Sequence, residues 1–156
     1  MTFRYRLACA ALSLVAVALL VSDVRADERP IRLHRGDIFV EIDNQFRVNV
    51  SGEGTISHMG LSAISGSGSA VPLGHRMFET SGELFVIAAD GDILYALFTG
   101  TLSKNEFGDL GFADLTVTFI GGTGRFSDAV GSAELLFSYD SLTGESDSSF
   151  DGTIDY

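Results

Sequence analysis

The side chains best suited to acid–base or ligand chemistry in this sequence are histidines and tyrosines inside apolar segments. His58 follows Ile56 at strand spacing, so we expect both to face the barrel or sheet interior, and Tyr95 and Tyr139 lie in apolar, strand-like runs. A buried tyrosine hydroxyl needs a hydrogen-bond partner, which a ligand can supply. We therefore name His58, Tyr95 and Tyr139 as candidate ligand-binding residues, with core packing or a structurally hydrogen-bonded histidine as the alternative.

Other chemical sites find little support. His34, His58 and His75 lack the short spacings of zinc ligands, and no Gly-x-Ser-x-Gly nucleophile motif occurs. The aspartates at 147, 151 and 155 are four residues apart, which puts them on one solvated side of a strand and not in a calcium loop. The sequence predicts no metal and no cofactor, and its catalytic residues, if any, stay unknown.

The segment GGTGRFSDAVGSA, residues 121–133, invites comparison with a nucleotide-binding loop. A dinucleotide loop has a third glycine and opens a helix, whereas here the third glycine is missing and another strand-like run follows. We interpret the segment as a tight corner in which glycines adopt positive φ and Phe126 plugs the end of a barrel. The residues of this turn motif are Gly121, Gly122, Gly124, Phe126 and Gly131.

The first 26 residues are typical of a signal peptide. Arg4 and Arg6 precede an uncharged apolar run, which ends in the small-residue pattern Val24-Arg25-Ala26. We expect residues 1–26 to be cleaved after export to a periplasm or the medium, a retained membrane anchor being the alternative. The only cysteine, Cys9, lies in this segment, so the mature chain has no disulfide.

The mature chain is strongly acidic. Without Arg4, Arg6, Arg25 and Asp23, the 10 basic residues become 7 and the 21 acidic residues become 20, so the formal net charge is 7 − 20 = −13. Nucleic acids and anionic membranes are bound through clustered lysine and arginine. We therefore expect neither nucleic acid nor, after signal cleavage, a membrane as a partner.

The rest of the chain predicts an all-β domain. Residues 27–37 are polar and predict a flexible leader, and from residue 38 to 156 short apolar runs alternate with glycine turns. Asp90-Gly91 between two apolar runs predicts a hairpin, and the serine–glycine run 65–69 suggests a mobile loop or weak strand edge. Seven or eight short strands without a helical period favour an antiparallel sandwich or barrel.

Two of the predicted strands are apolar on both faces. Residues 84–89 (LFVIAA) and 93–98 (ILYALF) leave an apolar face on the outside of any barrel. A barrel strand needs only one apolar face when its other face meets water. A partner subunit, a loop or the leader must cover the second face, and we expect a homo-oligomer.

Residues 121–133 closely resemble the G-G-T-G-x-F-x-x-A-x-G-x-A signature of dirigent proteins, and they are similar to the matching segment of secreted bacterial proteins with an allene-oxide-cyclase-like barrel. Gly52, Gly54, His58 and Gly60 match the G-x-G-x-x-x-H-x-G pattern of the bacterial group, and residues 90–92 and 152–156 also fit. The resemblance implies an eight-stranded, antiparallel, up-and-down β-barrel over most of residues 45–156, a lumen for a small apolar ligand, and trimers.

These features lead to three hypotheses for the function. The first, which we favour, is an exported barrel that binds a small apolar ligand in its lumen without a known reaction. The second is an isomerase or cyclase of the allene-oxide-cyclase or dirigent type, which the resemblance suggests. The third is a structural or stress-related exported oligomer without a ligand. A lumen filled by side chains would favour the third, and an inward acid or histidine beside a tyrosine the second.

Overall fold

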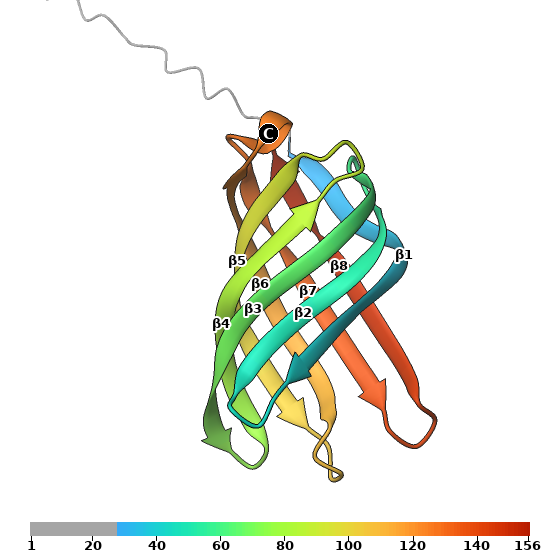
Figure 1. The fold of residues 1–156 in the computed structure, drawn as a ribbon, viewed down its shortest axis with the longest axis vertical. Coiled ribbons are helices and arrows are strands. Elements are labelled where there is room, and N and C mark those ends of the chain that lie inside the picture. The colour runs from blue at the N-terminus through green and yellow to red at the C-terminus, as the bar shows by residue number, and fades with distance from the viewer. Residues whose placement is uncertain (1–27) are drawn as a thin grey trace, which may run out of the picture.

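The computed structural model describes residues 28–156, which form a closed, all-antiparallel barrel of eight strands in up-and-down order (Figure 1). This confirms the predicted fold class, while the expected signal peptide, residues 1–26, lies outside the described part. The strands are β1 (Arg29–Ile42), β2 (Arg47–Ile56), β3 (Gly60–Gly74), β4 (Met77–Ile87), β5 (Ile93–Lys104), β6 (Leu110–Gly122), β7 (Val130–Asp140) and β8 (Glu145–Asp155). Among residues 28–156 no helix is long and apolar enough to cross a membrane.

Alternation along each strand decides which side chains enter the barrel. In β6, Leu115, Val117 and Phe119 are buried while the threonines between them are exposed. In β7, Leu135 and Phe137 are buried on the same principle, because successive strand residues point to opposite faces. The inward side chains of all eight strands form one apolar core, whose burial supplies most of the folding free energy.

Glycines at inward positions let neighbouring strands approach closely. Gly68 of β3 is paired with Gly82 of β4, and the ring of Phe98 from β5 covers both. A Cβ atom on Gly82 would lie 2.6 Å from Cζ of Phe98, and one on Gly68 would lie 2.8 Å from the same atom. The serine–glycine run 65–69 is therefore an interior part of β3 and not the loop or weak edge that its composition suggests.

Strand β1 begins earlier than the sequence predicts. Residues 29–37 were expected to form a flexible leader, but they belong to the barrel wall, where Arg29 to Arg32 pair with β8. The reason is that Ile31 points inward and is fully buried, while its polar neighbours face solvent. Two apolar side chains that pack against the core, Ile31 and Leu33, are too weak a pattern among many charged residues to reveal a strand.

The packing of Phe98 over two glycines makes a stability prediction. We expect Gly82→Ala to lower the free energy of unfolding by about 2–3 kcal/mol, because overpacking a rigid core displaces both the ring and the facing strand. Gly111→Ala is the matched control, since its new Cβ would lie 3.4 Å from its nearest neighbour, Cβ of Asn105, and we expect a change within about 0.5 kcal/mol.

The same measurement in a Phe98→Leu background separates the ring from the backbone. Removing Cζ of the ring relieves part of the conflict, so Gly82→Ala should cost less there than in the wild-type chain. Urea unfolding followed by circular dichroism measures all four variants. Equal costs for the two glycine substitutions would show that Gly82 is not needed for close packing.

Candidate functional site

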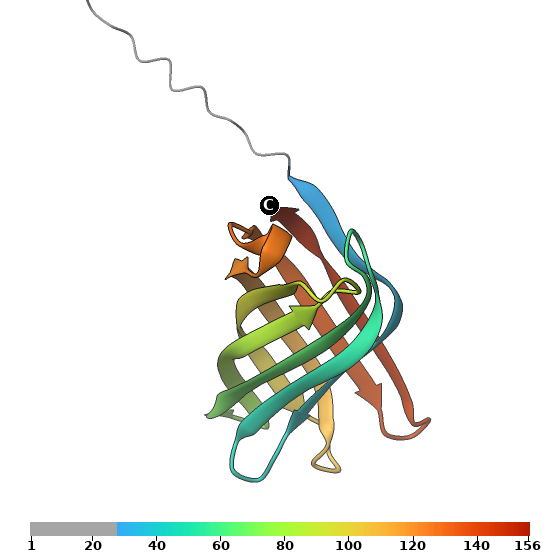
Figure 2. The ribbon, with the colours of Figure 1, turned by 45° about the horizontal axis from the view of Figure 1, so that its top comes forward.

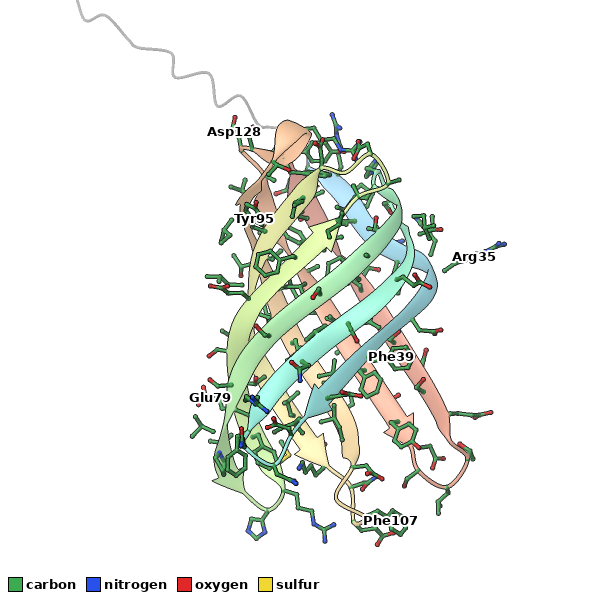
Figure 3. All side chains as sticks on the ribbon, viewed as in Figure 1. Arg35, Phe39, Glu79, Tyr95, Phe107 and Asp128 are labelled. Carbon is green, nitrogen blue, oxygen red and sulfur yellow. The ribbon has the colours of Figure 1, made fainter. Side chains whose placement is uncertain are left out.

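The three candidate ligand-binding residues lie in different places. His58 is in the turn between β2 and β3, has φ 62° and is exposed, so the prediction that it faces inward is wrong. Strand β2 ends at Ile56, and strand alternation does not extend into the turn. Tyr95 is half-buried on the outer face of β5, edge-on to Phe85 at 5.7 Å between ring centroids (Figure 3). Tyr139 alone of the three shares the inward side of its strand.

The other two histidines are also on the surface. His34 is within 2.9 Å of the Ser57 hydroxyl, and His75 lies in the turn after β3 with φ 47°. Within residues 28–156 no group of three or more histidine, cysteine or acidic side chains is placed to hold a metal ion. The histidines therefore contribute to no common site.

The glycine segment is a corner that closes one end of the barrel. Gly124 has φ 54° and begins a single turn of 3-10 helix, Gly124–Phe126, between β6 and β7. The Asp92 carboxylate accepts a hydrogen bond from the backbone amide of Arg125 at 3.1 Å, and the Arg125 guanidinium pairs with Asp90 at 3.1 Å. Thr123 Oγ1 accepts the amide of Ile93 at 2.8 Å. These contacts tie the corner to the hairpin between β4 and β5.

Phe126 fills the barrel beneath this corner, as predicted. Its side chain is fully buried, as is that of Ala129, and its ring packs edge-on against Tyr156 at 5.0 Å. Gly121, Gly122 and Gly131 supply the sharp backbone path around it: Gly121 has φ 113° and Gly131 φ 141°, and a Cβ on Gly122 would lie 2.8 Å from Cβ of Phe126. The segment is thus a structural plug.

The opposite end of the barrel is open because β1 parts from β8. The two strands pair only from Arg29–Ile154 to Arg32–Asp151, and β1 then has an irregularity between Leu33 and Arg35. Figures 1 and 2 show the two strands side by side near the C-terminus and apart toward the other end. Past the irregularity, the amide of Ile38 donates to the Ser148 hydroxyl at 3.1 Å in place of a backbone ladder.

A cleft of about 470 Å³ lies at this open end. Residues 39–44 of β1 and the following turn form one wall, with Asn49 of β2. Phe137 and Tyr139 of β7 form the facing wall, and the hairpin between β5 and β6 adds Lys104 and residues 108–110. Figure 3 shows Phe39 on β1 and Phe107 at the tip of the hairpin between β5 and β6, well below it. Tyr139 is therefore the one predicted site residue that lines the cleft.

The cleft combines buried apolar side chains with polar and charged groups. Phe137 is almost completely buried and Leu110 is buried beside it, whereas Glu41 and Asp109 are exposed. Lys104 also lines the cleft, but its ammonium lies 5.8 Å from the centroid of the Phe78 ring, which does not line it. Such a site can enclose an apolar or aromatic group and contact a polar one at its rim.

Two turns hold the rim of the cleft. Between β1 and β2, Asp43 Oδ1 accepts hydrogen bonds from the backbone amides of Gln45 and Arg47 at 2.8 and 2.9 Å. Its Oδ2 accepts a hydrogen bond from Nε of Arg47 at 2.7 Å. Between β5 and β6, Asn105 Oδ1 accepts the amides of Phe107 and Asp109 at 3.0 Å each. The buried Nδ2 of Asn105 has no hydrogen-bond partner among the described residues.

Most residues that line the cleft could not be predicted from the sequence. Phe39 and Glu41 follow directly after the expected leader, and nothing in their local pattern indicates that β1 leaves β8. Phe137 and Tyr139 share one face by simple alternation, which is the only local signal that points to this wall.

Comparisons of the chain with protein-family models, curated proteins and solved structures give no match. The likeness of residues 121–133 to the dirigent signature therefore depends on those residues themselves.

The turn between β1 and β2 makes a pH prediction. The hydrogen bond from the Arg47 amide, and next the one from its side chain, hold the pKa of Asp43 below its ordinary value of 3.8. A lowered carboxyl pKa adds stability at pH values above the unfolded-state pKa, and this is lost as the pH falls through the folded pKa. We expect an NMR titration of Asp43 to have its midpoint below 3.8.

Arg47→Gln tests the cause of this shift. It keeps the backbone amide and removes the guanidinium, so the pKa of Asp43 should rise only part of the way to its ordinary value. Arg35→Gln, a charge change on the exposed side of β1, is the control and should leave the midpoint unchanged. An Asp43 midpoint that is the same with and without the Arg47 guanidinium would contradict the assignment.

Proposed function

We propose that this protein binds a small, largely apolar molecule without transforming it, and that the molecule sits in the cleft at the open end of the barrel. The observation that carries the proposal is the cleft itself. Its volume of about 470 Å³ is in the range of small-molecule sites, and its lining combines aromatic and aliphatic side chains with as many polar and charged ones.

The proposed site is at the mouth and not in the middle of the lumen. Phe98, Leu115 and Phe150 are fully buried in the barrel interior, together with inward side chains from the other strands. Protein interiors packed in this way leave few voids larger than a water molecule. A ligand therefore has room where β1 and β7 face each other across the cleft, and Tyr139 is the predicted residue that we assign to it.

Binding is favoured over an isomerase or cyclase reaction. An enzyme of that type would gain from a histidine or acid held beside a tyrosine inside the barrel. His58 lies in an exposed turn and Tyr95 on the outer face. The acids Glu41 and Asp109, which line the cleft with Tyr139, are exposed to solvent and not held inside the barrel. The eight-stranded barrel and the plug at Phe126 support a distant relation to the dirigent and allene-oxide-cyclase-like groups, which we retain as part of the proposal.

Export completes the proposed role. A signal peptide at residues 1–26 would place the mature, acidic chain in a periplasm or outside the cell. There a cysteine-free barrel can keep its fold without disulfides, because its single core is large enough to be stable.

The binding proposal predicts a local mutational effect. We expect a neutral fluorescent probe, N-phenyl-1-naphthylamine, to bind the mature protein and to lose at least about ten-fold in affinity in Tyr139→Ala, since one wall of the cleft is removed. Phe107→Ala, at the exposed hairpin tip, is the matched control and should bind normally. Thermal melts verify that both variants fold. Unchanged affinity in Tyr139→Ala would contradict this location.

A second proposed role is self-assembly through an apolar belt on the outside of the barrel. The belt consists of Leu61, Ala63, Phe85, Ile87, Tyr95, Leu97, Ile120 and Val130. Strand pairing joins several of its members: Ala63 is opposite Ile87, Phe85 opposite Tyr95, and Ile120 opposite Val130.

The size of this belt supports a second copy of the chain as its occupant. From the exposed fractions of its members, the belt offers on the order of 600 Å² of apolar surface, at the upper end for a monomer and approaching the ~800 Å² that each partner buries in a typical interface. Like-charged chains can associate where the contact surface is apolar. We propose a homo-oligomer, and the family resemblance suggests a trimer.

Leu97→Lys tests the belt. A lysine in a packed apolar contact must be desolvated, so we expect the variant to sediment as a monomer while the wild-type chain sediments as an oligomer at micromolar concentration. Thr99→Lys adds the same charge two residues away on the same outer face, outside the belt, and should remain oligomeric. A monomeric wild-type protein would refute the assembly.

A further inference from the structure

We propose that the cleft at the open end of the barrel selects organic cations, and in particular ammonium groups carried on an apolar or aromatic body. This inference rests on the proposed binding function and adds to it the charge of the ligand. Two sets of side chains carry it: aromatic rings of β1 and β7 that line the cleft and carboxylates at its rim.

The aromatic rings come from both sides of the cleft. Phe39 lies on the β1 wall with 46% of its surface exposed, and Phe137 and Tyr139 lie on the β7 wall. The face of an aromatic ring carries partial negative charge and attracts a cation within about 6 Å of its centre. Phe39 alternates with the buried Ile38 and Val40 and so points to the outer side of β1, whereas Tyr139 lies half-buried on the inward side of β7. A trimethylammonium group at the rim of the cleft can contact either ring.

Carboxylates line the same cleft and the hollow next to it. Glu41 and Asp109 line the cleft itself. Tyr139 also lines an adjoining hollow on the hairpin between β7 and β8, where the acidic residues are Asp140, Glu145 and Asp147. Asp43 is engaged by Arg47 at 2.7 Å and is left out of this count. The acidic groups near Tyr139 thus outnumber the basic ones.

Lys104 is the one basic side chain that lines the cleft, and its charge is directed elsewhere. Its Nζ lies 5.8 Å from the centre of the Phe78 ring on β4. That cation–aromatic contact engages the ammonium away from Phe39 and Tyr139. The acidic surface of the mature chain adds a long-range attraction for cations that weakens as salt is added.

Three ligands with the same phenol body separate the effect of charge from that of shape. They are para-(trimethylammonio)phenol, its neutral carbon isostere para-tert-butylphenol, and the anion para-phenolsulfonate. We expect isothermal titration calorimetry to give at least about ten-fold tighter binding of the cation than of the isostere, with the anion weakest. The advantage of the cation should shrink as sodium chloride is raised.

A double variant tests the carboxylates. Glu41→Gln with Asp109→Asn should bring the affinity for the cation close to that for the isostere and leave the isostere unaffected. The matched control is Asp114→Asn with Glu134→Gln, which removes two charges from the exposed faces of β6 and β7. It should keep the preference for the cation. In the wild-type protein, addition of the cation should shift the amide NMR signals of Glu41, Asp109 and Tyr139.

Each outcome has a definite meaning. Equal affinity for the cation and the isostere, both perturbing the cleft, would overturn the charge preference and leave the binding function standing. Tightest binding of the anion would also overturn it and would show that Lys104 determines the charge preference of the cleft. If none of the phenols and no neutral probe binds, both the inference and the proposed function fail. Shifts confined to the outer belt would refute the cleft as the site.

Discussion

The whole architecture depends on one packing constraint, which is that eight strands must bend tightly enough to close around a single layer of core side chains. Where the sheet bends most sharply, an inward Cβ atom would clash with the backbone of the facing strand. Glycine at the crossing points removes that obstacle, and a large ring from an adjacent strand fills the space. Gly68, Gly82 and Phe98 show this arrangement most clearly, because one ring covers two facing glycines. The same residues therefore allow the sheet to curve and fill the core of the barrel.

Closure of the sheet leaves two ends, and they are finished in different ways. At one end the Asp92 carboxylate holds the corner through the Arg125 amide, and Phe126 fills the space beneath. At the other end the irregularity after Leu33 turns β1 away from β8, so the mouth is wide and lined by partly exposed side chains. A plugged end gives rigidity, and the open end gives the barrel a roomy cleft of mixed polar and aromatic lining. The two ends differ because of local backbone features, the corner between β6 and β7 at one end and the irregularity in β1 that precedes the other.

Sequence alone goes far for the fold and only a short way for the site. Alternation identifies the inward faces of β6 and β7, and Asp90-Gly91 marks its hairpin, because both signals are local. The same logic fails for the serine–glycine run 65–69, where low strand propensity hides a need for close packing that only the facing strand creates. It fails for His58 because the strand ends two residues earlier. The cleft depends on the path of β1 relative to β7, and these strands are far apart in the sequence. Of the residues that line it, only Tyr139 was therefore predicted as a site residue from the sequence.

The two proposed surfaces are compatible because the belt covers the outer wall of the barrel and the cleft opens at one end. The belt residues Ile87, Ile120 and Val130 flank the hairpin and the corner at the plugged end, and Tyr139 lines the mouth at the other. The two surfaces adjoin only where Ala63 of the belt shares a hollow with Phe39. Subunits that associate through the belt would bury the outer faces of β4 and β5, which explains why these strands are apolar on both sides. Their mouths would remain open to solvent, and the carboxylates there would stay out of the interface. An acidic chain can then assemble through its apolar surface and keep its charge where a cation would bind.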